Sequence, residues 1–320
     1  MKKFFLFFLE FICLINSASA QDTSKDSRMK WWCEARFGIV IYWGDYAVPA
    51  GNYKGIQIAH GGEWIMNRTK IPVAEYQQYA KQFNSVKFNA EDWVKMAREA
   101  GMKYIVITVK HHDSFAMFRL KVSKWNIVDS TSYGKDVLKQ LAAACKKYNI
   151  KLNFYYSQAH DWNNLGGAVA RKVSSEGRPN PDSTRIDAYS NKHKGHCDVA
   201  VLWWNTPTNV TDEAALKLQT LLKLHPNIIT NNRIKRPNFQ GDTKTPEQKI
   251  PKQEELDGEY GETCMTMIGT WDYKSWDNKW KSKESLLHNL IDITSKRGNY
   301  LLNFGPKADG TLLQQSVDLL

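Results

Sequence analysis

The stretch YIVITVKHHD, residues 104–113, is a short apolar run that ends in two histidines and an aspartate. Aromatic, polar or charged residues also follow apolar runs at residues 42–44, 155–157, 203–205 and 232–233. Buried parallel strands read as continuous apolar runs, and α/β barrels keep their active sites at the carboxyl ends of such strands. The pattern predicts an enzyme-like pocket. Because aromatic faces cover the C–H groups of a sugar ring while polar groups bind its hydroxyls, we expect a sugar ligand.

Strand-like and helix-like segments alternate along the chain, which favours a parallel sheet closed into a (β/α) barrel of the TIM type. Apolar runs predict strands at residues 37–42, 104–109, 152–156, 199–204, 228–231 and 300–304, with a weaker seventh at 265–268. Apolar residues at helical spacing predict helices at residues 73–83, 91–100, 135–148, 212–224 and 285–296. Residues 158–197 are rich in polar residues, glycine and proline, with only a hint of a helix at 187–194, so we expect an irregular or shortened repeat there.

Length and composition fit one barrel-sized domain. The chain has 320 residues, of which 42% are hydrophobic, enough for a large core. The formal net charge is +11, but the Lys and Arg residues are spread along amphipathic helices rather than clustered with exposed aromatics. We therefore do not expect a nucleic-acid partner.

The amino terminus has the organisation of a signal peptide. Residues 2–3 are both lysine, residues 4–15 are mainly apolar, and residues 18–20 form a small-x-small cleavage site before Gln21. We expect a signal peptide at 1–20, a barrel domain at 21–320, export to a periplasmic or extracellular location, and no membrane association after cleavage. Four cysteines remain in that mature chain, and their spacing is compatible with one disulfide or with four thiols: Cys33, Cys145, Cys197 and Cys264.

Several chemistries are disfavoured by the sequence. His111, His112 and Asp113 offer metal ligands, but neighbours at a strand end point in opposite directions and no further ligand stands at metal spacing. The chain has no G-x-S-x-G nucleophile elbow, no G-x-G-x-x-G motif and no P-loop. Glycoside hydrolysis by two carboxyl groups remains.

Seven motifs in order resemble the α-L-fucosidases of glycoside hydrolase family 29, from about Met29 to Gly310. The resemblance implies a (β/α) barrel, a retaining mechanism without cofactor or metal, and terminal α-linked L-fucose on an oligosaccharide or glycoconjugate as the substrate. We expect no counterpart of the carboxy-terminal β-sandwich that most members carry. The matching segments are residues 31–44, 62–64, 110–113, 154–157, 198–204, 241–247 and 298–303.

The resemblance also implies a set of substrate-binding positions. Carried over position by position, these are Glu63, Trp64, His111, His112, Tyr156, Trp203 and Arg233. Without the resemblance, the aromatic residues and His111 fit a packed core equally well, and Glu63 fits a solvated surface charge. Loop tryptophans at 271, 276 and 280 fit either an acceptor subsite or a loop packed on its own side chains.

Members of the family place the acid/base at one of two positions, which here are Glu247 and Glu262. The alternatives are open at this stage. Whichever serves needs a raised pKa to hold a proton near neutrality before it acts as a base towards water.

Three departures from the family bear on activity. Asn205 stands where the family has its Asp nucleophile, Tyr42 stands where relatives have a histidine, and the 158–197 segment is short. An amide is neutral and a poor nucleophile, so turnover should fall by orders of magnitude while the shape of the site is kept. Two hypotheses therefore stand: an exported α-L-fucosidase, or a fucose-binding homologue with impaired catalysis.

Overall fold

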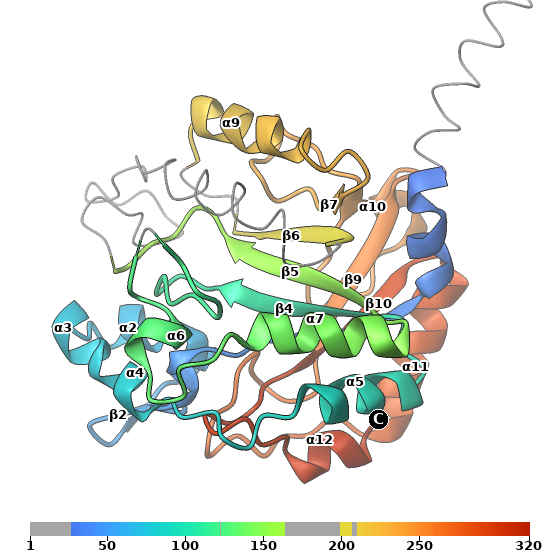
Figure 1. The fold of residues 1–320 in the computed structure, drawn as a ribbon. Coiled ribbons are helices and arrows are strands. Elements are labelled where there is room, and N and C mark those ends of the chain that lie inside the picture. The colour runs from blue at the N-terminus through green and yellow to red at the C-terminus, as the bar shows by residue number, and fades with distance from the viewer. Residues whose placement is uncertain (1–26, 122, 164–198, 207–209) are drawn as a thin grey trace, which may run out of the picture.

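The computed structural model describes residues 27–121, 123–163, 199–206 and 210–320. Its centre is a sheet of eight parallel strands, of which β4, β5 and β6 are seen as arrows above the helix α7 in Figure 1. The strands β4, β5 and β6 are buried over nearly their whole length and lead into the polar and aromatic residues at 110–113, 155–157 and 203–205. The strands are β1 (Phe37–Ile41), β4 (Tyr104–Lys110), β5 (Lys151–Ser157), β6 (Val201–Asn205), β7 (Ile229–Thr230), β8 (Thr243–Lys244), β9 (Tyr260–Thr266) and β10 (Asn299–Phe304).

The sheet closes on itself. The strand order is β7-β6-β5-β4-β1-β10-β9-β8, and a parallel bridge between Asn231 and Thr243 joins the two edges just beyond β7. Closure removes the free sheet edges and gathers all the carboxyl ends of the strands at one rim. The expected (β/α) barrel is therefore confirmed.

Helices of very different length surround the barrel. The long helices α5 and α7 begin at side-chain caps, in which Asn89 and Asp136 accept backbone N–H groups, and Ser282 caps α11 in the same way. The helices include α2 (Ile65–Arg68), α3 (Val73–Tyr76), α4 (Gln78–Gln82), α5 (Ala90–Glu99), α6 (Ile127–Ser130), α7 (Val137–Tyr148), α9 (Asp212–Leu222), α10 (Gln253–Leu256), α11 (Lys283–Ser295) and α12 (Gln314–Asp318), with the 3₁₀ turns η1 (Asp45–Ala47) and η2 (Gly62–Trp64) and the hairpin strands β2 (Asn52–Tyr53) and β3 (Ile56–Gln57).

The two ends of the barrel are closed differently. A helix at residues 27–35 packs across the amino ends of the strands, where Trp31 lies edge-on to Tyr104 at 6.2 Å and the backbone oxygen of Trp32 accepts from Asn299 Nδ2 at 2.8 Å. In Figure 1 this helix lies at the tails of the strand arrows, whereas α2, α3, α4 and α6 gather near the heads of β4 and β5. The open, loop-rich end is thus the carboxyl end.

Four expectations about the elements were inexact. The strand β8 was not predicted, because Thr243–Lys244 is short and polar. The strand β9 ends at Thr266, so it lies earlier than the predicted 265–268. The predicted helix 73–83 divides at Gln77 into α3 and α4, and the helix at 27–35 was not predicted.

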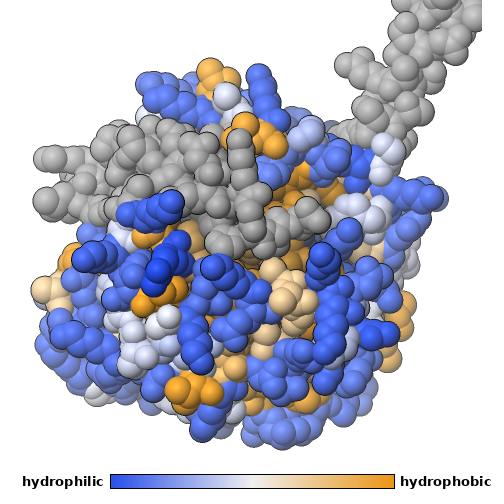
Figure 2. Space-filling model, viewed as in Figure 1, coloured by the Kyte–Doolittle hydropathy of each residue, from blue (hydrophilic) through white to orange (hydrophobic). Residues whose placement is uncertain are grey.

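Parts of the sequence-based predictions fall outside the described residues. These are the signal peptide, Cys197, the helix hint at 187–194 and most of the expected short repeat. Cys33, Cys145 and Cys264 form no disulfide with one another. Within the described ranges, no helix is both long and apolar enough to cross a membrane. The face in Figure 2 is mainly hydrophilic, with its apolar residues in separate small areas.

Candidate active site

The carboxyl ends of β4 to β7 carry a continuous stack of planar side chains. The ring of His111 lies parallel to that of Tyr155, 5.7 Å away with an interplanar angle of 10°, and Tyr155 stacks on Trp203 at 5.4 Å and 14°. The guanidinium of Arg233 lies over Trp203 at 4.6 Å. Because each strand contributes one member, the stack forms a wall across four strands of the barrel mouth.

The structure corrects one predicted site residue. Tyr156 packs edge-on against Trp204 at 6.3 Å in the core cluster that joins the barrel to its helices, and Lys110 Nζ lies over its ring. Tyr155 instead belongs to the cluster inside the barrel. Successive side chains of a strand point to opposite faces, and Tyr155 lies in register with Trp203, so Tyr155 takes the inward position.

Tyr42 also points into the barrel mouth. Its ring stacks on Trp271 at 5.4 Å and lies 5.1 Å from Tyr155. Burial raises the pKa of the Tyr42 hydroxyl well above its usual value, and the neighbouring Tyr155, Glu247 and Glu63 raise it further. Tyr42 is therefore a neutral hydrogen-bonding group beside two carboxyl groups of the site.

Trp271 differs from the other loop tryptophans. Trp276 packs on its own loop, where its Nε1 donates to the Gly51 oxygen at 3.4 Å and the ammonium of Lys274 lies over its ring at 4.1 Å. Trp280 packs against the main core cluster. Of the three, Trp271 is the one whose ring the structure stacks on a residue of the barrel mouth.

Asn205 ends β6 and is almost fully buried. Its Nδ2 lies 3.3 Å from His112 Nε2, and its backbone N–H donates to Gln158 Oε1 at 3.0 Å. An amide nitrogen can only donate, so His112 Nε2 accepts and the ring proton sits on Nδ1, 2.6 Å from Ser157 Oγ. The amide is thus held in one orientation at the expected nucleophile position.

Trp64 covers the side of the site that holds Asn205. Its ring lies 4.9 Å from the ring of His112 and 5.1 Å from that of Trp162, in both cases edge to face. His160 completes this cluster, 4.5 Å from His112. Neither His160 nor Trp162 was predicted, although both follow the polar end of β5.

His111 is a buried neutral imidazole. Burial lowers the pKa of His111 well below its usual value, and the charges of His160 and Lys110 lower it further. Its Nδ1 atom is buried without a hydrogen-bond partner among the described residues. Since buried polar atoms in folded proteins nearly always have a partner, this atom is a candidate contact for a ligand hydroxyl.

Glu63 is not a surface charge. It lies in η2 with 3% of its surface exposed, and its carboxyl group lies near that of Asp272, a residue that the motif comparison did not select. Burial raises the pKa of Glu63 well above its usual value, and the charge of Asp272 adds to the effect.

Glu247 and Glu262 lie at opposite ends of the barrel. Glu247 follows β8 at the carboxyl end, where its side chain is 37% exposed and its Oε2 accepts from Arg233 at 3.1 Å. Glu262 lies near the start of β9 and is buried, with Tyr104 and Trp203 each donating to one of its oxygens at 2.7 Å. Burial raises the pKa of Glu262, and these two hydrogen bonds oppose that rise.

The residues considered for a metal do not converge on one point. Asp113 is occupied by local contacts, because its carboxyl oxygens accept from Tyr76 OH and from the backbone N–H of Phe115, both at 3.0 Å. Within residues 27–121, 123–163, 199–206 and 210–320, no group of three or more His, Cys, Asp and Glu side chains is placed to hold a metal ion.

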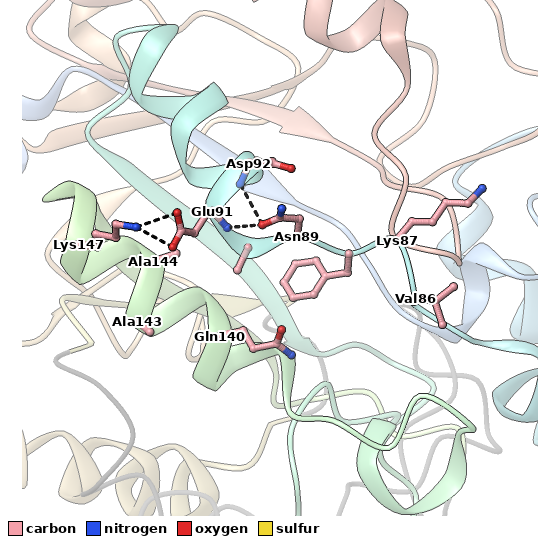
Figure 3. Close-up of a pocket in the computed structure, with 11 residues that line it drawn as sticks. Val86, Lys87, Asn89, Glu91, Asp92, Gln140, Ala143, Ala144 and Lys147 are labelled. Carbon is pink, nitrogen blue, oxygen red and sulfur yellow. Dashed lines mark hydrogen bonds and ion pairs between the residues drawn. The ribbon is translucent and has the colours of Figure 1, made fainter.

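A second hollow lies on the outside of the barrel, between the start of α5 and α7 (Figure 3). It has a volume of about 640 Å³. Its polar groups are already paired, because Lys147 Nζ binds both carboxyl oxygens of Glu91 and Asn89 caps α5. The arrangement is structural and offers no catalytic group.

Fold and site together define a (β/α)-barrel protein of the glycosidase type. The family model for α-L-fucosidase matches residues 15–320. Rat tissue α-L-fucosidase is 27% identical over 322 residues, which cover 91% of this chain and 66% of the rat protein. The chain therefore belongs to the α-L-fucosidase family.

Solved structures show the same relationship. Unliganded α-L-fucosidase AlfC from Lactobacillus casei has a TM-score of 0.82 and 28% identity, covering 92% of this chain and 95% of AlfC. α-L-fucosidase isoenzyme 1 from Paenibacillus thiaminolyticus has a TM-score of 0.80 and 30% identity, covering 92% of this chain and 74% of that protein.

Proposed function

We propose that this chain binds terminal α-linked L-fucose of a glycan in the barrel mouth and is an α-L-fucosidase-type retaining hydrolase whose turnover is limited by Asn205. The observation that carries the proposal is the stack of His111, Tyr155 and Trp203 beside the carboxyl groups of Glu63 and Glu247. A flat aromatic wall suits the C–H face and methyl group of fucose, whereas His111 and the carboxyl groups suit its hydroxyls.

Related structures support fucose as the sugar. An Asp-to-Ala mutant of AlfC has been solved with 4-nitrophenyl-α-L-fucopyranoside substrate, and AlfC itself with α-L-fucose product. The same mutant has been solved with Fuca(1,6)GlcNAc. These ligands share a terminal fucose, so we infer a fucosylated oligosaccharide or glycoconjugate as the partner of this chain.

Of the two carboxyl groups considered as acid/base, the geometry favours Glu247. Arg233 orients its carboxyl group, and its partial exposure lets it exchange protons with water and with a leaving group. In the retaining route Glu247 would protonate the glycosidic oxygen and later remove a proton from the attacking water. Glu262 is buried beneath Trp203 and is occupied by two donors, so we assign it to the barrel core.

The nucleophile is the missing part of this mechanism. A carboxylate at position 205 would form a covalent fucosyl ester, whereas the neutral Asn205 amide forms no such ester and puts no negative charge opposite the oxocarbenium-like transition state. The second candidate function, a fucose-binding homologue without useful turnover, follows from the same residue. The hydrogen bond to His112 keeps the shape of the site, so binding can persist where hydrolysis does not.

Hydrolysis of an aryl α-L-fucoside with and without azide tests the proposal, together with calorimetric titration of L-fucose. Azide attacks from the side that a carboxylate would occupy, so a formed site should yield β-fucosyl azide. Binding with azide rescue would support the disabled fucosidase, and binding without rescue would support the binding homologue. The absence of both binding and rescue would refute both functions.

Export of the protein is also a proposal. It rests on the basic residues, apolar stretch and small-x-small site of residues 1–20. Intact mass measurement on protein expressed in a secreting host should give a chain that begins at Gln21. A cell-associated protein of uncleaved mass would contradict export.

A further inference from the structure

Two loops at the carboxyl end of the barrel meet through a pair of buried carboxyl groups. Glu63 lies in η2, after β1, and Asp272 lies in the loop after β9; they are 3% and 0% exposed. Asp272 Oδ1 accepts from the backbone N–H of Gly62 at 2.8 Å and from Thr270 Oγ1 at 2.9 Å. A Cβ on Gly62 would come within 2.4 Å of Asp272 Oδ2, so glycine permits this close approach.

The pair needs one proton to be stable. Glu63 Oε2 and Asp272 Oδ2 are both buried without a hydrogen-bond partner among the described residues. The two carboxyl groups lie close enough for each to perturb the pKa of the other. A carboxyl oxygen can donate only when it is protonated, so one proton lies between two groups that cannot both ionise at low cost. Burial raises the pKa of both groups.

Other charged and titratable groups face the pair from α2, η1, β5 and the loops after β1 and β9. Arg68 in α2 favours the ionised form of Glu63, and Lys274 favours that of Asp272. Lys274 also ties the two loops together, because its Nζ donates to the backbone oxygens of Ile58 and His60 at 3.4 and 3.2 Å. The charge of Glu63 also raises the pKa values of three nearby hydroxyl groups, those of Tyr42, Tyr46 and Tyr155.

The pair is coupled to the aromatic wall by the chain itself. Trp271, which precedes Asp272, stacks on Tyr42. The charge of Glu63 in turn raises the pKa of Tyr42. A movement of Asp272 away from Glu63 would therefore shift a ring of the barrel mouth as well as a hydroxyl-binding carboxyl group.

We propose that Asp272 is a positioning residue of the sugar site: it shares one proton with Glu63, holds the Glu63 carboxyl group in place as a hydrogen-bond acceptor for a sugar hydroxyl and holds Trp271 against Tyr42, so that loss of the shared proton weakens sugar binding. This inference rests on the proposed fucose function. A merely structural anchor would affect stability and leave the pH dependence of binding unchanged.

The test is titration calorimetry of L-fucose from about pH 5 to about pH 9. The variants are D272N, in which the amide can still donate to Glu63, and D277N, a matched control in the same loop. Asp277 Oδ1 accepts from the backbone N–H of Lys279, outside the carboxyl pair. In the wild type and in D277N, we expect the affinity for L-fucose to fall about tenfold as the pH rises. The reason is that the charge-assisted hydrogen bond between Glu63 and Asp272 is lost when the shared proton leaves. In D272N this fall should disappear.

A second variant keeps both carboxyl groups and does not depend on D272N folding. T270V removes the Thr270 donor that stabilises ionised Asp272, so the fall in affinity should move to higher pH. Identical pH profiles in the wild type, D272N and T270V would overturn the inference while leaving fucose binding intact. If the wild type binds no fucose at any pH, the proposed function fails and this role of Asp272 fails with it.

Discussion

Glu247 and Glu262 show how the two ends of one barrel use the same residue type differently. At the amino end, Glu262 receives hydrogen bonds from Tyr104 and Trp203, beneath the helix at residues 27–35. At the carboxyl end, Glu247 keeps one ordered contact, to Arg233, and a partly exposed surface. The carboxyl group at the amino end is thus used as an acceptor within the core, whereas the carboxyl group at the other end is partly exposed and lies at the same rim as His111, whose Nδ1 has no partner among the described residues.

Restoring a carboxylate at the carboxyl end should have the largest effect. We expect N205D to raise the hydrolysis of an aryl α-L-fucoside on the order of 10³-fold or more, because a covalent intermediate becomes possible. The rate of aryl alcohol release measures it, with N205A as the matched control that gains no nucleophile. Equal rates in N205D and N205A would contradict a formed fucosidase site.

The next effect concerns Glu247 in the N205D background. E247Q keeps the shape but carries no acidic proton, so hydrolysis of a fucoside with a poor leaving group should fall about 10²- to 10⁴-fold. Azide should restore part of the rate with an activated leaving group, because defucosylation no longer needs a base. If E262Q lost hydrolysis rate in this way and E247Q did not, Glu262 rather than Glu247 would be the acid/base.

The amino-end carboxyl group should matter for stability instead. E262A leaves the Tyr104 hydroxyl and the Trp203 indole N–H without their acceptor, and should lower the free energy of unfolding by about 2–4 kcal/mol. Urea denaturation measures the change. E247A, at the partly exposed site, should change it by less than about 1 kcal/mol. Equal losses in the two variants would remove the contrast between the ends.

The smallest effect separates the inner and outer faces of β5. Y155F removes an inward hydroxyl next to Tyr42, and should weaken L-fucose binding by about three- to tenfold. Y156F alters a ring in the outer core, and should leave fucose binding unchanged. Calorimetric titration of both variants with L-fucose measures the two affinities. A larger loss in Y156F than in Y155F would contradict the assignment of these two faces.

The buried carboxyl groups at the carboxyl end of the barrel should also make the free energy of unfolding depend on pH. Glu63 and Asp272 have pKa values raised above those of free carboxyl groups, chiefly by burial. Their contribution to stability is therefore fully present at low pH and is lost as the pH rises through the raised pKa values. The unfolding free energy of the wild type relative to D272N should fall across this range, and a constant difference would contradict the shared proton.

Most strands could be predicted because buried parallel strands have continuous apolar sequence. β8 could not, since Thr243–Lys244 is held by its neighbours β7 and β9 rather than by its own apolar residues. The predicted helix 73–83 has a helical period throughout, but its division at Gln77 depends on packing beside the barrel mouth.

The site was predicted unevenly for a related reason. His111, Trp203 and Arg233 stand at strand ends, where a motif and a strand position agree. The choice between Tyr155 and Tyr156 depends on strand register, which the motif Tyr155-Tyr156-Ser157 does not contain. Asp272 lies 209 positions from Glu63, so the pair exists only because β1 and β9 end at the same rim.

The sequence by itself determined the barrel and the family, because these depend on local apolar runs and ordered motifs. The anomaly at Asn205 is a prediction from the identity of one side chain. Only the tertiary structure decided which of Glu247 and Glu262 faces the barrel mouth, which tyrosine of β5 points inward, and that the carboxyl groups of Glu63 and Asp272 are buried close together. The physical reason is that burial, register and contacts between distant loops are set by closure of the sheet, which no single segment encodes.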